Sequence, residues 1–325
     1  MTTPVMVALD GTDKDERAIP AALAFAELAA ADLLLVRVVD EVAPAAAGGE
    51  PSGGSDAPEA PEAPEAQHAE ARRSLDGIAS RLAADAAVRV AAEVVPGADV
   101  ADALLAHAGL RGARMLVMAT RAAGPVGRAL GGSVADRVAH ASPLPVVLVP
   151  PGGADYHDRR DQLRRALVPL DGSPLSRQVL DHLLAFRRSD LLEIVLCEVV
   201  SPPVLDAAAL LAPPPRPGGL ATEVDPFGEA PAAPDLHAAA ARRLEAVADG
   251  LRARGVAVET RVEEGERPAD AICGAVRASL ADFVAMASRG QRGLERLVLG
   301  STAEGVVRHG DVPVLLVTPA AAAPP

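Results

Sequence analysis

The hydrophobic residues of this chain fall into short branched runs separated by longer stretches rich in Ala and Leu. The runs VMVAL, LLLVRVV, MLVMA and PVVLV, which start at residues 5, 33, 115 and 145, have the length and composition of buried β-strands. The stretches between them are long enough for helices. Strands that alternate with helices predict a parallel sheet with right-handed crossovers, so the pattern indicates an α/β fold.

The same pattern occurs twice. The segment VMVALDGTDKDERAIP from Val5 matches ALVPLDGSPLSRQVLD from Ala166, and GSVADRVAHASPLPVVLV from Gly132 matches GSTAEGVVRHGDVPVLLV from Gly300 without a gap. The repeat predicts two tandem doubly wound domains, each a mostly parallel five-stranded sheet flanked by helices. We place the first domain at residues 1–153 and the second at 162–320, on either side of a linker rich in Pro, Gly and charged residues.

Two segments depart from the repeat, and each follows the second strand of its own half. Residues 43–67 and 201–234 are rich in Pro, Ala, Gly and Glu. Such segments bury too little surface to offset the entropy of ordering, so the composition predicts mobile inserts.

Length and charge narrow the class of protein. A chain of 325 residues, half of them hydrophobic, can bury more than one core. The formal net charge of -13 argues against partners that are nucleic acids or anionic membranes, because both are bound through clustered Lys and Arg. The sequence shows no secretory signal at its start and no stretch typical of a membrane span, and its two cysteines support neither a disulfide framework nor a zinc site. We therefore expect a cytoplasmic protein.

Candidate binding residues lie where strands of the second half end, because open parallel sheets bind ligands at the carboxyl ends of their strands. Asp171 ends the first strand, and its carboxylate can accept hydrogen bonds from a ligand. Ala287-Ser288-Arg289-Gly290 ends the fourth strand, and Gly290 lets backbone N–H groups approach an anion. Gly300-Ser301-Thr302 opens a helix whose first N–H groups favour phosphate.

These residues give the chain a resemblance to the universal stress protein family, as a tandem member. The nucleotide loop of that family reads Gly, two residues, Gly, nine residues, Gly, then Ser or Thr, and the second half departs from it only at Ala287. The resemblance implies a nucleotide alpha hydrolase-like fold that binds ATP, normally with Mg²⁺. In this chain it implies that Asp171 and the main chain near Val199 hold the adenosine, and that the phosphates are surrounded by Gly290, Gly300, Ser301 and Thr302. Arg289 either steadies the phosphates or is solvated.

The first half has lost both early glycines of the loop. It carries Ala119 and Ala122 before Gly132-Ser133, and Pro125 stiffens the segment between them. An Ala forced to positive φ costs more than Gly, so we interpret this first site as degenerate. Asp10 is kept, but an aspartate here can equally cap the following helix, and the same alternative applies to Asp171.

Catalysis finds little support in the sequence. There is no GxxxxGK[ST] loop, no GxSxG elbow and no Cys-His pair proposed by spacing, and the sole lysine, Lys14, does not follow a Gly-rich turn. His140 and His309 do not occupy matching positions of the repeat. We expect no enzyme, with a slow hydrolysis of ATP at most.

Two functions remain open. One is a nucleotide-binding protein of stress response or signalling, in which the second half binds ATP. The other is a scaffold of the same fold that binds no nucleotide and acts through a protein partner. The resemblance also implies that the last strand of each repeat pairs with the other, which makes an internal pseudo-dimer. It leaves open a homodimer of the whole chain.

Overall fold

The computed structural model describes residues 3–39, 64–84, 87–120, 134–151, 163–186, 191–201, 235–288 and 300–318. The strands are β1 (Val5–Ala8), β2 (Leu33–Val39), β3 (Val90–Pro96), β4 (Met115–Ala119), β5 (Val146–Val149), β6 (Arg165–Pro169), β7 (Glu193–Val200), β8 (Ala257–Glu264), β9 (Phe283–Ala287) and β10 (Val314–Val317). They form one ten-stranded sheet in the order β3-β2-β1-β4-β5-β10-β9-β6-β7-β8.

The two halves of the sheet meet at β5 and β10. These strands pair antiparallel, with Leu315 opposite Val147, whereas the strands within each half pair in parallel. Each half therefore has the strand order of a doubly wound unit, and the two units are related by a local two-fold at the β5–β10 pair. This arrangement confirms the predicted fold class and the internal pairing of the last strands.

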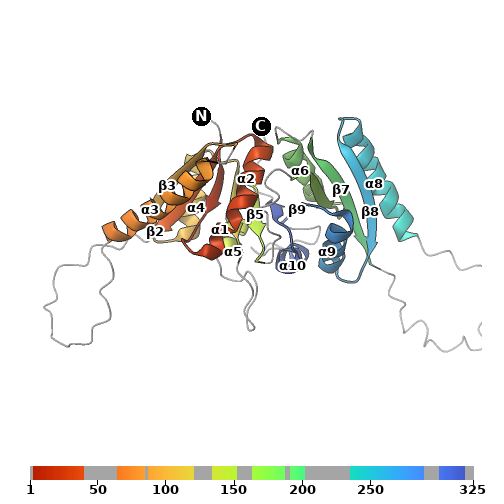
Figure 1. The fold of residues 1–325 in the computed structure, drawn as a ribbon. Helices are drawn as coiled ribbons and strands as arrows, with labels where there is room; N and C mark the ends of the chain where they lie inside the picture. The colour runs from red at the N-terminus through yellow and green to blue at the C-terminus, as the bar shows by residue number, and fades with distance from the viewer. Residues whose placement is uncertain are drawn as a thin grey trace, which may run out of the picture.

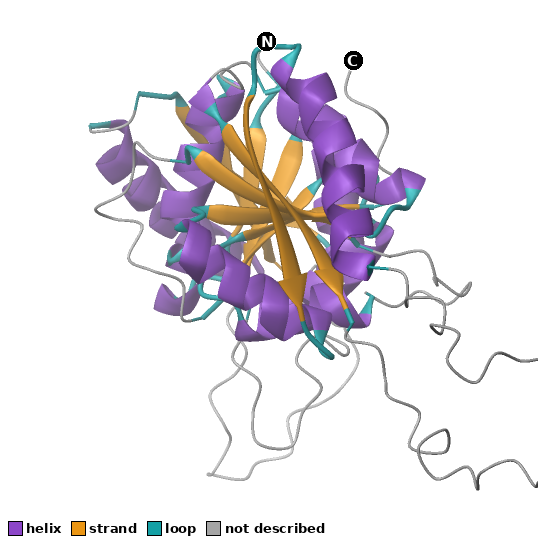
Figure 2. Cartoon of the chain, turned by 90° about the vertical axis from the view of Figure 1, so that its right-hand side faces the viewer, coloured by secondary structure: helices purple, strands orange, loops and turns teal. Residues whose placement is uncertain are grey.

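Helices cover both faces of the sheet (Figures 1 and 2). One face carries α2 (Ala18–Ala29), α3 (Pro64–Ala83), α6 (Pro174–Leu184) and α8 (Leu236–Arg252), and the short α1 (Asp13–Glu16) precedes α2. The other face carries α4 (Val100–Leu110), α5 (Val134–Ala141), α9 (Pro268–Ser279) and α10 (Ser301–His309). Strands covered on both faces must be apolar throughout, which explains why β1, β5 and β10 are buried at every position. No helix within the described residues has the length and apolarity to cross a membrane.

The core is shared by the two halves. Phe25 of α2 makes edge-to-face contacts with Phe283 of β9, at a centroid distance of 5.1 Å, and with Phe186 after α6, at 6.5 Å. Phe25 and Phe186 occupy matching positions of the repeat. On the other side of the same junction, the Thr318 hydroxyl donates to the Ser142 carbonyl at 2.8 Å. The halves are thus joined by packing as well as by strand pairing.

The hydrophobic pattern locates most of the elements. The four runs of the first half coincide with β1, β2, β4 and β5, but the pattern did not single out the edge strands β3 and β8. Both edge strands are only partly buried and carry polar residues, as in the β8 sequence AVETRVEE. Residues 64–67 of the first predicted insert belong to α3. Three other segments lie outside the described part of the chain: the rest of the first insert, residues 202–234 of the second insert, and residues 152–162 of the linker.

A strained residue ends α9. Leu280 has φ 54°, in the left-handed region, and its side chain is 78% exposed; the matching position in the first half is Gly112, with φ 59°. Leu280→Gly should therefore raise the free energy of unfolding by about 0.5–1 kcal/mol, because glycine removes the Cβ strain and little buried area is lost. Urea unfolding measures the change. Leu280→Ala, which keeps a Cβ, is the control, and equal stability of the two variants would contradict the strain.

Candidate functional site

In each half, two neighbouring central strands are followed by helices on opposite faces of the sheet. In the second half these strands are β6, followed by α6 on one face, and β9, followed by α10 on the other. We call the carboxyl ends of β6 and β9 the second switch point, and those of β1 and β4 the first switch point. Ligands of doubly wound sheets bind at such points.

Asp171 follows β6 in a tight turn rather than capping a helix. Its Oδ1 accepts the Ser173 N–H at 2.9 Å, and Gly172 between them has φ 80°. The N-cap of α6 is Ser173, whose hydroxyl accepts the Ser176 N–H at 3.1 Å. The alternative that Asp171 is the helix cap is therefore wrong. The Asp171 side chain is exposed at the end of the strand.

The first half repeats this turn. Asp10 Oδ1 accepts the Thr12 N–H at 2.7 Å, and Gly11 has φ 88°. Thr12, not Asp10, is the N-cap of α1. The shared turn explains why both halves keep the Asp-Gly pair, since the carboxylate and the glycine shape the turn whether or not a ligand binds.

The start of α10 is held against the end of β9. The carbonyl of Ser288, which directly follows the buried Ala287, accepts the Gly300 N–H at 2.8 Å. Gly300 is the N-cap, and no side chain caps the helix in the part of the chain that the structure describes. The N–H groups of Ser301 and Thr302 lie in the first turn, where a helix offers no internal acceptor. Arg289 and Gly290 lie outside the described residues.

Strand register brings the remaining predicted residues to the same edge. Pro169 is opposite Cys197 in the β6–β7 pair, so continuing the register by two residues places Val199 beside Asp171. The β6–β9 register, with Ala166 opposite Phe283, likewise leads to Ala287 beside the end of β6. The second switch point thus gathers Asp171, Val199, Ala287, Gly300, Ser301 and Thr302.

Ionisable groups around this edge have structural partners. Glu198 of β7 forms an ion pair with Arg243 of α8. Cys197 is buried under the sheet edge, and desolvation raises the pKa of its thiol to about 12. Neither it nor Cys273 is in a disulfide. His140 lies away from this edge, in α5 of the first half, where its Nδ1 is 2.5 Å from the Asp136 carbonyl, which fits a packing role.

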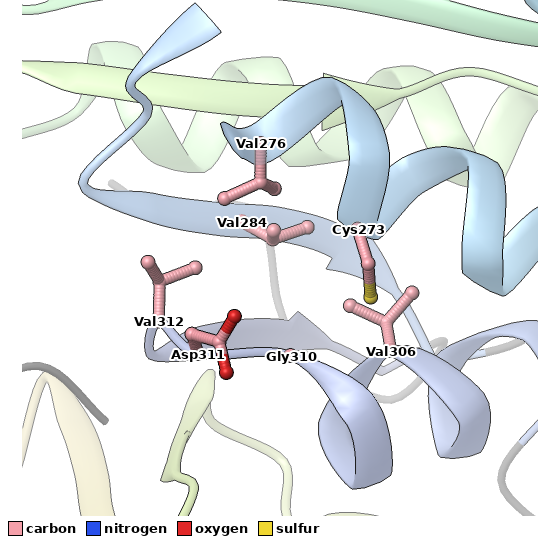
Figure 3. Close-up of a pocket in the computed structure, with 7 residues that line it drawn as sticks. All are labelled: Cys273, Val276, Val284, Val306, Gly310, Asp311 and Val312. Carbon is pink, nitrogen blue, oxygen red and sulfur yellow. The ribbon is translucent and has the colours of Figure 1, made fainter. Parts of the chain in front are cut away.

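A small apolar pocket lies elsewhere, at the amino ends of β9 and β10 (Figure 3). It is lined by Cys273, Val276, Val284, Val306, Gly310, Asp311 and Val312, and its free space is that of about one water molecule. Desolvation raises the pKa of Cys273 there. The pocket is therefore a packing defect too small for a nucleotide, at the edge opposite the switch points. In the described residues, no cluster of His, Cys, Asp and Glu has the arrangement of a metal site.

Three residues contribute structural contacts around the two switch points that the sequence analysis did not predict. Ser173 caps α6, and its position directly after an Asp-Gly pair is a signal that the sequence shows. Ser288 receives the start of α10 through its carbonyl, which no side-chain pattern reveals. Arg17 reaches the carbonyl that ends β4, a contact between residues 103 positions apart.

The fold and the paired strand ends define a tandem doubly wound protein with two related switch points. The universal stress protein family matches it over residues 1–150 and 162–318, so the chain belongs to that family.

The individual relatives resemble this chain over a short segment or at low sequence identity. A universal stress protein of Methanocaldococcus jannaschii, MJ0531, is 41% identical over 63 residues, which are 19% of this chain and 36% of that protein. The match thus spans about a third of that relative's length. The crystal structure of a universal stress protein from Archaeoglobus fulgidus covers 97% of this chain and 96% of its own, with 17% identity and a TM-score of 0.64. A universal stress protein solved in complex with cAMP covers 46% of this chain and 96% of its own, with 25% identity and a TM-score of 0.34.

Proposed function

We propose that the second half of this universal stress protein binds an adenine nucleotide, ATP, and that the protein acts in cytoplasmic stress response or signalling. The observation that carries this proposal is the start of α10. Its N-cap glycine is fixed to the end of β9, so the first-turn N–H groups of Ser301 and Thr302 are held at the second switch point. A preset row of donors at a helix start favours phosphate.

The rest of the nucleotide is assigned to the β6 side of the same edge. The exposed Asp171 and the main chain at Val199 stand where the adenosine would lie, across the switch point from the phosphate donors. Mg²⁺ would be held mainly by the phosphate oxygens, because the described residues offer no metal cluster of their own. Conformation or partner choice, rather than turnover, is the output, with at most a slow hydrolysis of ATP.

The scaffold function remains the alternative. It needs the fold, the paired halves and a protein partner, but no bound nucleotide. The two functions differ in one respect that can be measured directly, which is whether the loop from Ala287 to Thr302 is occupied.

Thermal unfolding with and without Mg-ATP tests the proposal. A ligand that binds only the folded state must raise its stability by mass action. The wild type and Ala122→Val should both shift upward, whereas Gly290→Val should not, because its side chain would crowd the phosphates in the second half. Ala122 is the matched control, since it occupies the position of Gly290 in the first half.

Each other outcome has a defined meaning. If none of the three proteins shifts at millimolar ATP and no nucleotide is carried through purification, nucleotide binding fails and the scaffold function takes its place. If Ala122→Val loses the shift and Gly290→Val keeps it, the nucleotide lies in the first half.

A further inference from the structure

We propose that Arg17 closes the first switch point to nucleotide, and that the second is open because Gln178 stands at the matching position. This inference rests on the proposed function and explains how one chain carries two unequal copies of the same site. It assigns the difference to a side chain outside the glycine loop.

The helix that follows the first strand is built differently in the two halves. In the first half it breaks at Arg17, between α1 and α2, and in the second α6 is continuous (Figure 1). The cause is Pro20, which has no N–H to donate to the carbonyl of Glu16 four residues earlier. The matching residue in the second half is Asp181, which has an N–H.

The break places Arg17 where it spans the first switch point. Its Nη2 donates to the carbonyl of Thr120, the buried residue that directly follows β4. The Nε of Arg17 is buried and has no hydrogen-bond partner among the described residues. Arg17 therefore ties the start of α2, on one face of the sheet, to the end of the strand whose following helix lies on the other face.

The corresponding carbonyl in the second half has a different donor. Ser288 matches Thr120, and its carbonyl accepts the N–H of Gly300 from the start of α10. Gln178, which matches Arg17, is exposed to solvent. Among the described residues, the Ser288 carbonyl is thus engaged from the start of α10 and the Thr120 carbonyl from across the switch point. Gly132, which matches Gly300, lies outside these residues.

A second guanidinium reinforces the closure. The guanidinium of Arg37 in β2 lies against Gly11. A Cβ built on Gly11 would be 2.5 Å from Nη1 of Arg37. The matching residue in β7 is Glu198, which is drawn away by its ion pair with Arg243. Neither matching position of the second half carries an arginine.

A nucleotide entering the first switch point would have to displace Arg17 and leave the buried Thr120 carbonyl without the guanidinium donor that it has among the described residues. The loss of one such partner corresponds to a penalty of about tenfold or more in affinity. Exchanging the residues at positions 17 and 178 should therefore remove this loss of affinity from the first half and introduce it in the second.

The experiment uses the full chain, equilibrium dialysis with radiolabelled Mg-ATP to count bound nucleotides, and photolabelling with azido-ATP followed by peptide mapping to locate them. Wild type should bind one nucleotide per chain and be labelled in the second half. Arg17→Gln should gain a second equivalent and label in the first half. Gln178→Arg/Asp181→Pro, which transplants both the guanidinium and the helix break, should weaken binding about tenfold. Gln178→Met/Asp181→Pro, with the break alone, should retain it.

The outcomes separate this inference from the proposed function. If wild type binds no nucleotide, the proposed function fails. If wild type binds and labels only the second half, but Arg17→Gln gains no label in the first half, Arg17 does not determine the difference. Two equivalents in wild type, or equal affinity of the two Asp181→Pro variants, would overturn the closure while leaving nucleotide binding in place.

Discussion

Replacing Phe25 by alanine is expected to lower the free energy of unfolding by about 3–5 kcal/mol. The side chain is fully buried, and its ring meets Phe283 and Phe186, which both belong to the other half. The substitution removes the buried area, leaves a cavity and abolishes two edge-to-face contacts, each worth about 0.5–1.5 kcal/mol beyond burial. Urea unfolding followed by circular dichroism measures the loss.

Phe25→Leu is the control, because it retains most of the apolar volume and should cost markedly less. A double-mutant cycle with Phe283→Leu should show a coupling energy, since the two rings touch across the junction. A cost below about 1 kcal/mol for Phe25→Ala would show that the shared core is not a source of stability. Two separate unfolding transitions in the wild type would show that the halves do not unfold as one unit.

The fold was predictable because its central strands are marked by short apolar runs in the sequence, and because the same runs occur in both halves. Buried parallel strands read as continuous apolar runs, so VMVAL and PVVLV mark β1 and β5 directly, and the second copy supports each assignment. The edge strands β3 and β8 lack that signal, because both are only partly buried and polar residues interrupt their apolar runs. Their place in the sheet comes from pairing with β2 and β7, which is a long-range property.

The candidate site was predictable only in part. Glycine spacing pointed to α10 and to its first-turn donors, because a helix start has a known chemistry wherever it occurs. The contact of Arg17 with Thr120 could not be predicted, since a side chain that donates to a distant carbonyl leaves no residue pattern at the acceptor. Pro20 is a local signal in the sequence, but the helix break at Arg17 and the contact that Arg17 makes depend on how the sheet folds. The remaining nucleotide contacts stay predictions until Arg289 and Gly290 are tested by substitution.

Ser301→Asp is expected to abolish the stabilisation by Mg-ATP without destabilising the protein. Ser301 is exposed in the first turn of α10, where a carboxylate interacts favourably with the helix dipole, so the unliganded variant should be about 0.3–1 kcal/mol more stable than wild type. The same carboxylate would stand among the N–H donors assigned to the phosphates and repel them. Wild type at a ligand concentration one hundred times its Kd should gain about 2.7 kcal/mol, and the variant should gain none of it.

The opposite signs of the two effects make this variant informative, because a protein that merely misfolds would lose stability in both conditions. Ser133→Asp is the matched substitution in the first half and should leave the response to Mg-ATP intact. A full response in Ser301→Asp would mean that the phosphates do not lie at the start of α10. Loss of the response in Ser133→Asp alone would place the nucleotide in the first half, and the fixed helix start at the second switch point would then not be the group that holds the phosphates.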